Sequence, residues 1–139
     1  MESLRCIPMQ VRFKLDCCGV KLKLEHWHRF GEGDRLRLTQ LSGDDVEAYA
    51  SAVQALVYQV QGAPAGTLPI EVNPGWESEA VPPEVAAQAA QVGVAVPQED
   101  WRSLTPLQRF ALIKLSRPGH ENRNFYPALV EFGLVQRQD

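Results

Sequence analysis

The chain is expected to fold around residues 101–129, whose sequence is WRSLTPLQRFALIKLSRPGHENRNFYPAL. Thr105 can cap a helix, Pro106 suits its first position, and Gln108 can bond back to the cap. The helix that follows is apolar around most of its circumference. Its apolar residues are Leu107, Phe110, Ala111, Leu112, Ile113 and Leu115. A helix of this kind belongs in the middle of a core.

A polar turn follows this helix, which is expected to end before Pro118. The turn carries Ser116, Arg117, His120, Glu121, Asn122, Arg123 and Asn124. Guanidinium groups bind phosphate or carboxylate, and the amides and imidazole add hydrogen bonds. We predict a partner-binding or ligand-binding site here, which Arg5 and Arg12 join if the two halves of the chain pack face to face. The alternative is a turn held by its own contacts, such as an ion pair of Glu121 and a helix cap by Asn124.

The composition is that of a soluble globular protein, with 139 residues of which 45% are hydrophobic and 22% charged. No apolar run approaches the roughly 20 residues of a membrane helix, and the first residues lack the pattern of a signal peptide. The three cysteines, Cys6, Cys17 and Cys18, do not make a disulfide framework. These features predict a cytoplasmic protein with free thiols.

The charges are segregated along the chain. Residues 1–40 hold eight basic and five acidic residues, a net of +3, and residues 102–139 hold six and three, again +3. Residues 41–101 hold nine acidic residues and no Lys or Arg, a net of −9. Two interpretations stay open: internal charge compensation, or a basic face for an anionic partner or ligand.

An internal repeat is indicated by a shift of 74 positions. Trp27 then falls on Trp101 and Arg35 on Arg109, so the tryptophans are expected to anchor equivalent places in a core. Other matches at this shift are Pro8 with Pro82, Val11 with Val85, Gly19 with Gly93, Glu25 with Glu99, and Leu38 with Leu112. The alternative is chance alignment of a helical chain rich in alanine.

The helical spacing predicts an all-α domain of about six helices, arranged as two copies of a three-helix unit. The repeat halves are about 5–61 and 81–135, in a single domain spanning 1–139. The most amphipathic helix is expected to start at a capping pair of Asp44 and Glu47 and to end at Gly62.

Three further segments have their own predictions. Val20 to Leu24 alternates like a strand, but we expect an extended connector, because its only apparent partner is 94–96. The Pro/Gly-rich linker 62–80 is expected to be pinned to the surface by Ile70, Val72 and Trp76. A final helix is expected at roughly 121–132, with Pro127 either delaying its start or kinking it.

A metal site has weak support from Cys6, Cys17, His26 and His28. Tetrahedral zinc needs four thiolate or imidazole ligands, usually in pairs two to four residues apart. Cys17 and Cys18 are adjacent, which is too close for such a pair, and Cys18 falls on an apolar stripe. We therefore predict no metal and no cofactor, and expect buried cysteines with surface histidines.

No catalytic site is predicted. The sequence contains no P-loop and no Gly-rich dinucleotide fingerprint. Cys6 is the only cysteine with a basic neighbour, Arg5, and nothing places a base and an orienting acid beside it. Nucleic-acid binding is not expected, since the chain is acidic overall and has no basic helix face.

Two stretches resemble a known family. SLRCIPMQVRFKLDCCGVKLKLEHWHRF, residues 3–30, and TPLQRFALIKLSRPGHENRNFYPAL, residues 105–129, are similar to the nitrate reductase-associated proteins. The family's name refers to genes near those of nitrate reductase and of molybdopterin cofactor synthesis, and implies no settled catalytic role. Its members carry a Phe-rich acidic segment before the Ser-Leu-Arg-Cys run, so we expect that a segment is missing or shorter here.

The resemblance implies a non-catalytic accessory protein of nitrate assimilation. Its expected partner is nitrate reductase or a molybdenum-cofactor synthesis protein, with no role for nucleic acid or membrane. A second hypothesis is a carrier of a small anionic cofactor, such as a pterin nucleotide, at the polar turn. A third is a metal binder that uses thiol and imidazole ligands.

Overall fold

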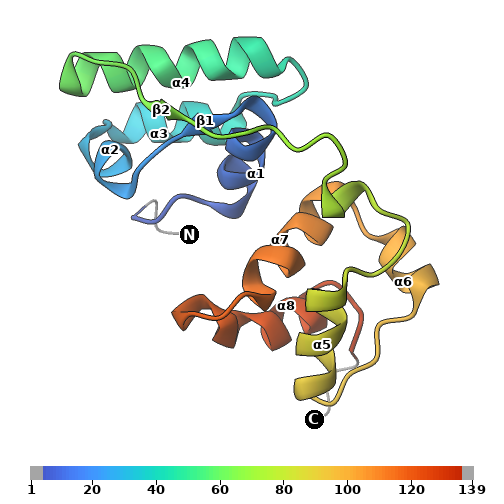
Figure 1. Cartoon of the computed structure of the whole chain (residues 1–139). Helices are drawn as coiled ribbons and strands as arrows, with labels where there is room; N and C mark the ends of the chain where they lie inside the picture. Colours follow the sequence, from blue (N-terminus) through green and yellow to red (C-terminus); the bar gives the residue numbers. More distant parts are fainter. Residues whose placement is uncertain (1–4, 136–139) are drawn as a thin grey trace. The chain divides into compact units, whose positions relative to one another are not determined.

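A computed structural model describes residues 5–135, and Figure 1 shows the course of the chain. The chain divides into two compact units between Glu71 and Val72. This boundary falls inside the predicted linker 62–80. The prediction that both halves form one domain stays a prediction.

The described residues are mostly helical, as predicted. They form eight α-helices, two 3-10 helices and one two-stranded sheet, so the expectation of about six helices and no sheet was wrong. The first unit contains α1 (Met9–Cys18), β1 (Val20–Lys21), α2 (Leu24–Arg29), α3 (Glu32–Gln40), α4 (Val46–Gln61) and β2 (Gly66–Thr67). The second contains η1 (Gly75–Glu77), α5 (Pro83–Gln91), α6 (Gln98–Ser103), α7 (Pro106–Ser116), η2 (His120–Asn124) and α8 (Phe125–Glu131).

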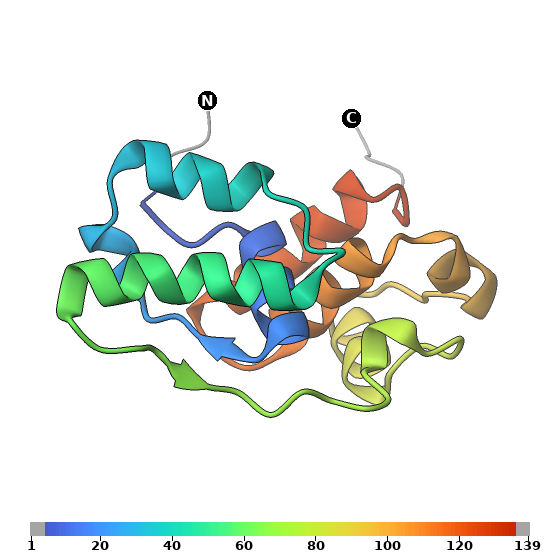
Figure 2. The ribbon, with the colours of Figure 1, turned by 90° about the horizontal axis from the view of Figure 1, so that it is seen from above.

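In the first unit, α1 and α4 form the main helix pair. α4 lies against α1 and also contacts α3 (Figures 1 and 2). The cap of α4 is Asp45, whose carboxylate accepts a 3.0 Å hydrogen bond from the backbone N–H of Ala48. The predicted cap, Asp44, was therefore one residue early. Gly62, with φ 73°, ends the helix in the left-handed conformation that glycine adopts without steric cost.

The segment after α1 is a strand with a partner, which corrects the predicted unpaired connector. Val20 pairs with Thr67 in the antiparallel sheet of β1 and β2. The chain needs glycine at position 19, just before β1, because φ there is 75° and a Cβ would lie 2.9 Å from the carbonyl oxygen of Leu68. The partner strand comes from the linker, and no local sequence pattern indicates a pairing over that distance.

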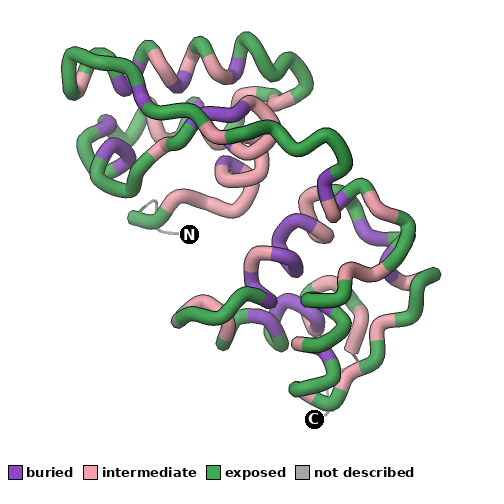
Figure 3. Tube along the Cα trace, viewed as in Figure 1, coloured by how far each residue is buried: buried purple, intermediate pink, exposed green. Residues whose placement is uncertain are grey.

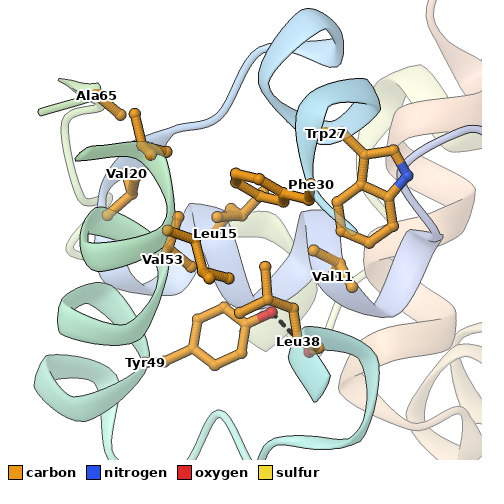
Figure 4. Packing of buried hydrophobic residues seen from close by; sticks show 11 residues of the cluster. Val11, Leu15, Val20, Trp27, Phe30, Leu38, Tyr49, Val53 and Ala65 are labelled. Atoms are coloured by element: carbon orange, nitrogen blue, oxygen red, sulfur yellow. Dashed lines mark hydrogen bonds between the residues drawn. The ribbon is translucent and has the colours of Figure 1, made fainter. Parts of the chain in front are cut away.

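The core of the first unit is a single apolar cluster (Figure 4). The phenol of Tyr49 on α4 reaches through it and donates a 2.8 Å hydrogen bond to the carbonyl of Leu38 on α3. This bond ties the two helices, because a buried hydroxyl without a partner is costly. The buried members are Val11, Leu15, Val20, Trp27, Phe30, Leu38, Tyr49, Val53, Leu56, Val57 and Ala65.

The second unit is built around α7, as the apolar pattern predicts. The predicted capping box is present, since Thr105 Oγ1 accepts from Gln108 N–H at 3.1 Å and Gln108 Oε1 accepts from Thr105 N–H at 3.0 Å. η1, α5, η2 and α8 all pack on α7, most of which is buried (Figure 3). Its buried residues are Phe110, Ala111, Leu112, Ile113, Leu115 and Ser116.

Only one of the three predicted linker anchors is buried. The Trp76 ring packs edge-on against Phe110, with centroids 5.3 Å apart and an interplanar angle of 74°. Ile70 and Val72 are 60% and 90% exposed, respectively. The predicted pinning of the linker therefore depends on Trp76 alone among these three residues.

The predicted final helix is two elements. η2 occupies its first part, and α8 begins only at Phe125. Pro127 is the third residue of α8, in the first turn, where a missing N–H breaks no intrahelical bond. Pro127 thus fits the predicted late start and not a kink.

Each unit contains a tryptophan held by an arginine. Arg35 donates from Nε to the Trp27 carbonyl at 2.9 Å and from Nη2 to the His28 carbonyl at 2.8 Å. In the second unit, Arg109 donates from Nε to the Trp101 carbonyl at 3.1 Å and from Nη2 to the Arg102 carbonyl at 2.8 Å. In both, the guanidinium carbon is 6.0 Å from the centroid of the tryptophan ring. We call these the two arginine clamps; each satisfies carbonyls at the end of a short helix.

Trp27 and Trp101 are fully buried, as the pattern predicts. None of the helices in residues 5–135 combines the length and the apolar character needed to span a membrane.

Candidate functional site

The predicted polar turn begins where α7 ends. Ser116, the last residue of α7, is buried and donates a 2.7 Å hydrogen bond to the Ile113 carbonyl. Gly119, with φ 146°, then carries the backbone into η2. The turn is therefore attached directly to the most buried helix of the second unit, which fixes its base.

Asn122 holds the turn closed. Its Nδ2 donates to the carbonyls of Leu115, at 3.0 Å, and of Arg117, at 3.3 Å. Its Oδ1 accepts a 3.1 Å hydrogen bond from Gln88 Nε2 on α5. The amide thus bridges α7, the turn and α5, so Asn122 has a structural role, and its part in binding stays a prediction.

The remaining predicted residues of the turn differ in exposure. Arg117, Arg123 and Asn124 are exposed, and their side chains make no hydrogen bond or ion pair within the described part of the chain. Asn124 is the N-cap residue of α8, as predicted, but its side chain makes no capping bond. Glu121 is half-buried, and the side chain of His120 lies outside the described residues. The arrangement is two exposed guanidinium groups on a turn braced by Asn122.

Arg5 and Arg12 belong to the first unit, whereas the polar turn belongs to the second. Arg12 is half-buried and donates from Nε to the carbonyl of Ile7 at 3.1 Å. Arg5 is exposed, and its carbonyl accepts a 2.7 Å hydrogen bond from His28 Nε2. Their predicted gathering at the polar turn stays a prediction.

His26 is a buried structural residue, which corrects the expectation of a surface histidine. Its Nε2 is 2.9 Å from Gln61 Oε1, and its Nδ1 accepts the N–H of Lys23 at 3.2 Å. Gln61 Nε2 donates to the Ala63 and Pro64 carbonyls, which leaves Oε1 as the acceptor and assigns the His26 proton to Nε2. Both ring nitrogens of this neutral imidazole are engaged, so neither can bind a metal without breaking a bond.

The other predicted metal ligands do not gather around His26. His28 uses Nε2 in its bond to Arg5, Cys6 is exposed, and Cys17 is half-buried. Cys18 is half-buried too, and burial raises the pKa of its thiol, which makes it a poorer nucleophile and ligand. Within residues 5–135 no three His, Cys, Asp or Glu side chains are grouped closely enough to hold a metal ion.

One surface was missed by the sequence interpretation. A groove of about 330 Å³, open to solvent, lies along α3. We call it the α3 groove; it is lined by Gly33, Leu36, Arg37, Gln40 and Leu41. These positions recur at spacings of three and four, so they share one helix face. That spacing was visible in the sequence, but α3 was interpreted only as the weaker counterpart of a core helix.

Comparison with known proteins places the chain in a family. The model of the conserved nitrate reductase-associated proteins matches residues 1–132. Neither the curated proteins nor the solved structures contain a match. Because the match covers nearly the whole sequence, including the clamps, the α3 groove and the polar turn, the chain belongs to the conserved nitrate reductase-associated protein family.

Proposed function

We propose that this chain is a non-catalytic, cytoplasmic accessory protein that binds a protein of the molybdenum-cofactor nitrate reductase system. The partner is nitrate reductase or a protein of cofactor synthesis. The observation that carries this proposal is the family match over residues 1–132, because the family's name implies an association with nitrate reductase.

The polar turn is the proposed contact surface. Arg117 and Arg123 are exposed, and Asn122 already holds the backbone between them in place. A preformed turn loses little conformational entropy on binding, and guanidinium groups bind carboxylates through two parallel hydrogen bonds. These properties favour an acidic loop of a partner protein.

Affinity capture from cells grown on nitrate, followed by mass spectrometry, tests this function. The tagged full chain is expected to retain nitrate reductase or a cofactor-synthesis protein, and the double variant Arg117→Ala/Arg123→Ala is expected to lose it. Arg102→Ala is the matched control, since Arg102 is also an exposed arginine of the second unit. Capture of neither kind of protein by the unaltered chain would contradict the proposal.

A second candidate is a carrier of a small anionic cofactor, such as a pterin nucleotide, at the same two arginines. Their exposed guanidinium groups, unpaired within the described residues, favour it. A ligand at 100 times its Kd adds about 2.7 kcal/mol to the free energy of unfolding. A thermal-shift screen with pterin nucleotides is expected to show a rise in Tm that Arg117→Ala and Arg123→Ala abolish. A rise that both variants keep would exclude the polar turn as the site.

We further propose that the two units are copies of one helical plan, larger than the predicted three-helix unit. α2 and α6 have the same length and begin 74 positions apart, as do the starts of α1 and α5 and of α3 and α7. Gly19 and Gly93 have φ of 75° and 76°, and both clamp arginines donate from Nε and Nη2 to carbonyls that lie 74 positions apart. In this plan α4 corresponds to η2 together with α8, which begin at the same shift.

A further inference from the structure

We propose that the α3 groove receives an aromatic side chain from an acidic segment of the partner protein. This inference deepens the proposed function and rests on it for the partner being a protein. It also uses the two-copy plan, because the second unit contains a covered version of the same helix.

The counterpart of Leu36 on α3 is Phe110 on α7, 74 positions later. Phe110 is fully buried and is covered by Trp76 of η1. Arg109 of the second clamp donates from Nη1 to the Trp76 carbonyl at 3.1 Å. A Cβ at Gly75 would lie only 3.1 Å from Ile113, so the covering backbone runs directly along the helix. The second unit thus covers this helix face with a Gly-Trp-Glu segment of its own.

Leu36 itself is 46% exposed, although it holds the corresponding position. The α3 groove around it measures about 330 Å³, near the lower end of the roughly 300–1,000 Å³ range of ligand pockets. A space of this size suits one large side chain better than a whole cofactor. Aromatic residues bury the most apolar surface per side chain, and they are enriched where proteins bind one another.

The charge of the groove selects an acidic segment. Among the described residues, Arg37 is the only charged one that lines the groove, and no described carboxylate lines it. Arg37 is exposed and makes no ion pair with a described residue, while Glu32 and Asp34 stand in the first turn of α3, outside the lining. In the second unit, Glu77 directly follows the covering Trp76. An aromatic residue followed by a carboxylate therefore places the ring on Leu36 and the negative charge beside Arg37.

The test uses a peptide with the chain's own covering sequence, VNPGWESEA, residues 72–80, blocked at both ends. It is titrated into the ¹⁵N-labelled full chain while backbone amide shifts are followed by NMR. The tethered copy of this segment has a high effective concentration and keeps the face of α7 filled. The expected shifts therefore lie in residues 33–41, and a peptide with Trp76→Ala is expected to give none.

Two variants and one control locate the binding. Leu36→Asp and Arg37→Glu are each expected to weaken peptide binding about tenfold or more, as loss of a central contact does. Leu24→Asp is the control, because Leu24 is a similarly exposed leucine of the same unit, at 49%, and does not line the groove. All three positions are exposed, so an amide spectrum that keeps its dispersion confirms that each variant is folded.

Several outcomes overturn the proposal. They are no shift at millimolar peptide, shifts confined to α7, binding unchanged in Leu36→Asp, or a dimer of the unaltered chain that Leu36→Asp dissociates. The capture experiment separates this proposal from the proposed function. If the peptide binds at α3 but no nitrate-system protein is captured, the groove proposal is supported and the proposed function is contradicted. If the Leu36→Asp variant still captures nitrate-system proteins and the peptide does not bind, the proposed function is supported and the groove proposal is contradicted.

Discussion

α3 and α7 begin 74 residues apart and are held by equivalent arginine clamps, yet their environments differ. α7 buries six residues, whereas α3 buries only Leu38. The difference comes from the neighbours. In the first unit the long helix α4 packs mainly on α1, while in the second unit η1, α5, η2 and α8 all pack on α7. Whether each of these two helices is buried or exposed thus depends on which segments cover it.

The largest expected effect is the difference in stability loss between alanine variants of Phe110 on α7 and Leu36 on α3. Phe110→Ala removes a buried ring and its contact with Trp76, so it is expected to lower the free energy of unfolding by about 3–5 kcal/mol. Leu36→Ala, at a half-exposed position, is expected to cost less than about 0.5 kcal/mol. Urea denaturation followed by fluorescence measures both. Equal costs would mean that α3 is as well covered as α7, contrary to the comparison.

The clamps are the next test, since here the two units are expected to behave alike. Arg35→Met and Arg109→Met each remove charged donors to the two carbonyls at the end of a short helix, at a cost of about 1.5–3 kcal/mol, and Arg109→Met also removes the donor to the Trp76 carbonyl. Arg→Lys is expected to restore little, because an ammonium cannot reproduce the planar fork. Thermal unfolding of the four variants provides the comparison. A large loss from one clamp and none from the other would break the equivalence of the units.

Tyr49 is expected to make the stability of the first unit depend on pH. Burial raises the pKa of Tyr49 above its ordinary value of 10.0. The phenol is therefore a stabilising donor below pH 10, and this stability is lost as the pH rises beyond 10, where the unfolded chain releases the proton first. Tyr49→Phe is expected to cost about 1 kcal/mol at neutral pH, because it leaves the Leu38 carbonyl without this donor.

The measurement is urea denaturation at pH 7 and at steps above pH 9. The difference between Tyr49→Phe and the unaltered chain is expected to shrink as the pH rises. Tyr58→Phe is the control, since Tyr58 is 60% exposed. A difference that stays constant up to pH 11 would show that the Tyr49 proton does not contribute in this way.

The smallest effects are expected at the starts of the two helices. Thr105→Ala removes the cap of α7 and is expected to cost about 1 kcal/mol. α3 starts at Gly31, which has no capping side chain and has φ −67°, so Gly31→Ser is expected to stabilise by a few tenths of a kcal/mol. Circular dichroism melts of both variants check the signs. A loss on Gly31→Ser would indicate that the start of α3 tolerates no side chain.

Local signals in the sequence predicted the features that depend on neighbouring residues. Thr105, Pro106 and Gln108 identified the start of α7, and the apolar residues after them identified its burial. The match of Trp27 with Trp101 at a shift of 74 positions, a signal that is not local, also indicated two buried anchors. The local signals operate over one or two helical turns, so they can be recognised without knowing the fold.

Other features depended on contacts between distant segments and were missed or misassigned. β1 pairs with a strand of the linker, and the imidazole of His26 is bound to Gln61, 35 residues away. For the polar turn, the sequence left open a binding site or a turn held by its own contacts, and it did not show that Asn122 closes the turn through Leu115 and Gln88. No spacing rule distinguishes a polar side chain that closes a turn from one that faces solvent.

The sequence by itself determined the helical class of the fold, the capped and buried α7, the buried tryptophans and the family. Only the tertiary structure decided that α7 is covered by Trp76 while Leu36 on α3 stays exposed, and that Asn122 braces the turn that presents Arg117 and Arg123. The physical reason is that capping and helical periodicity are set by residues a few positions apart. Burial and hydrogen-bond partners depend on which remote segment reaches each face.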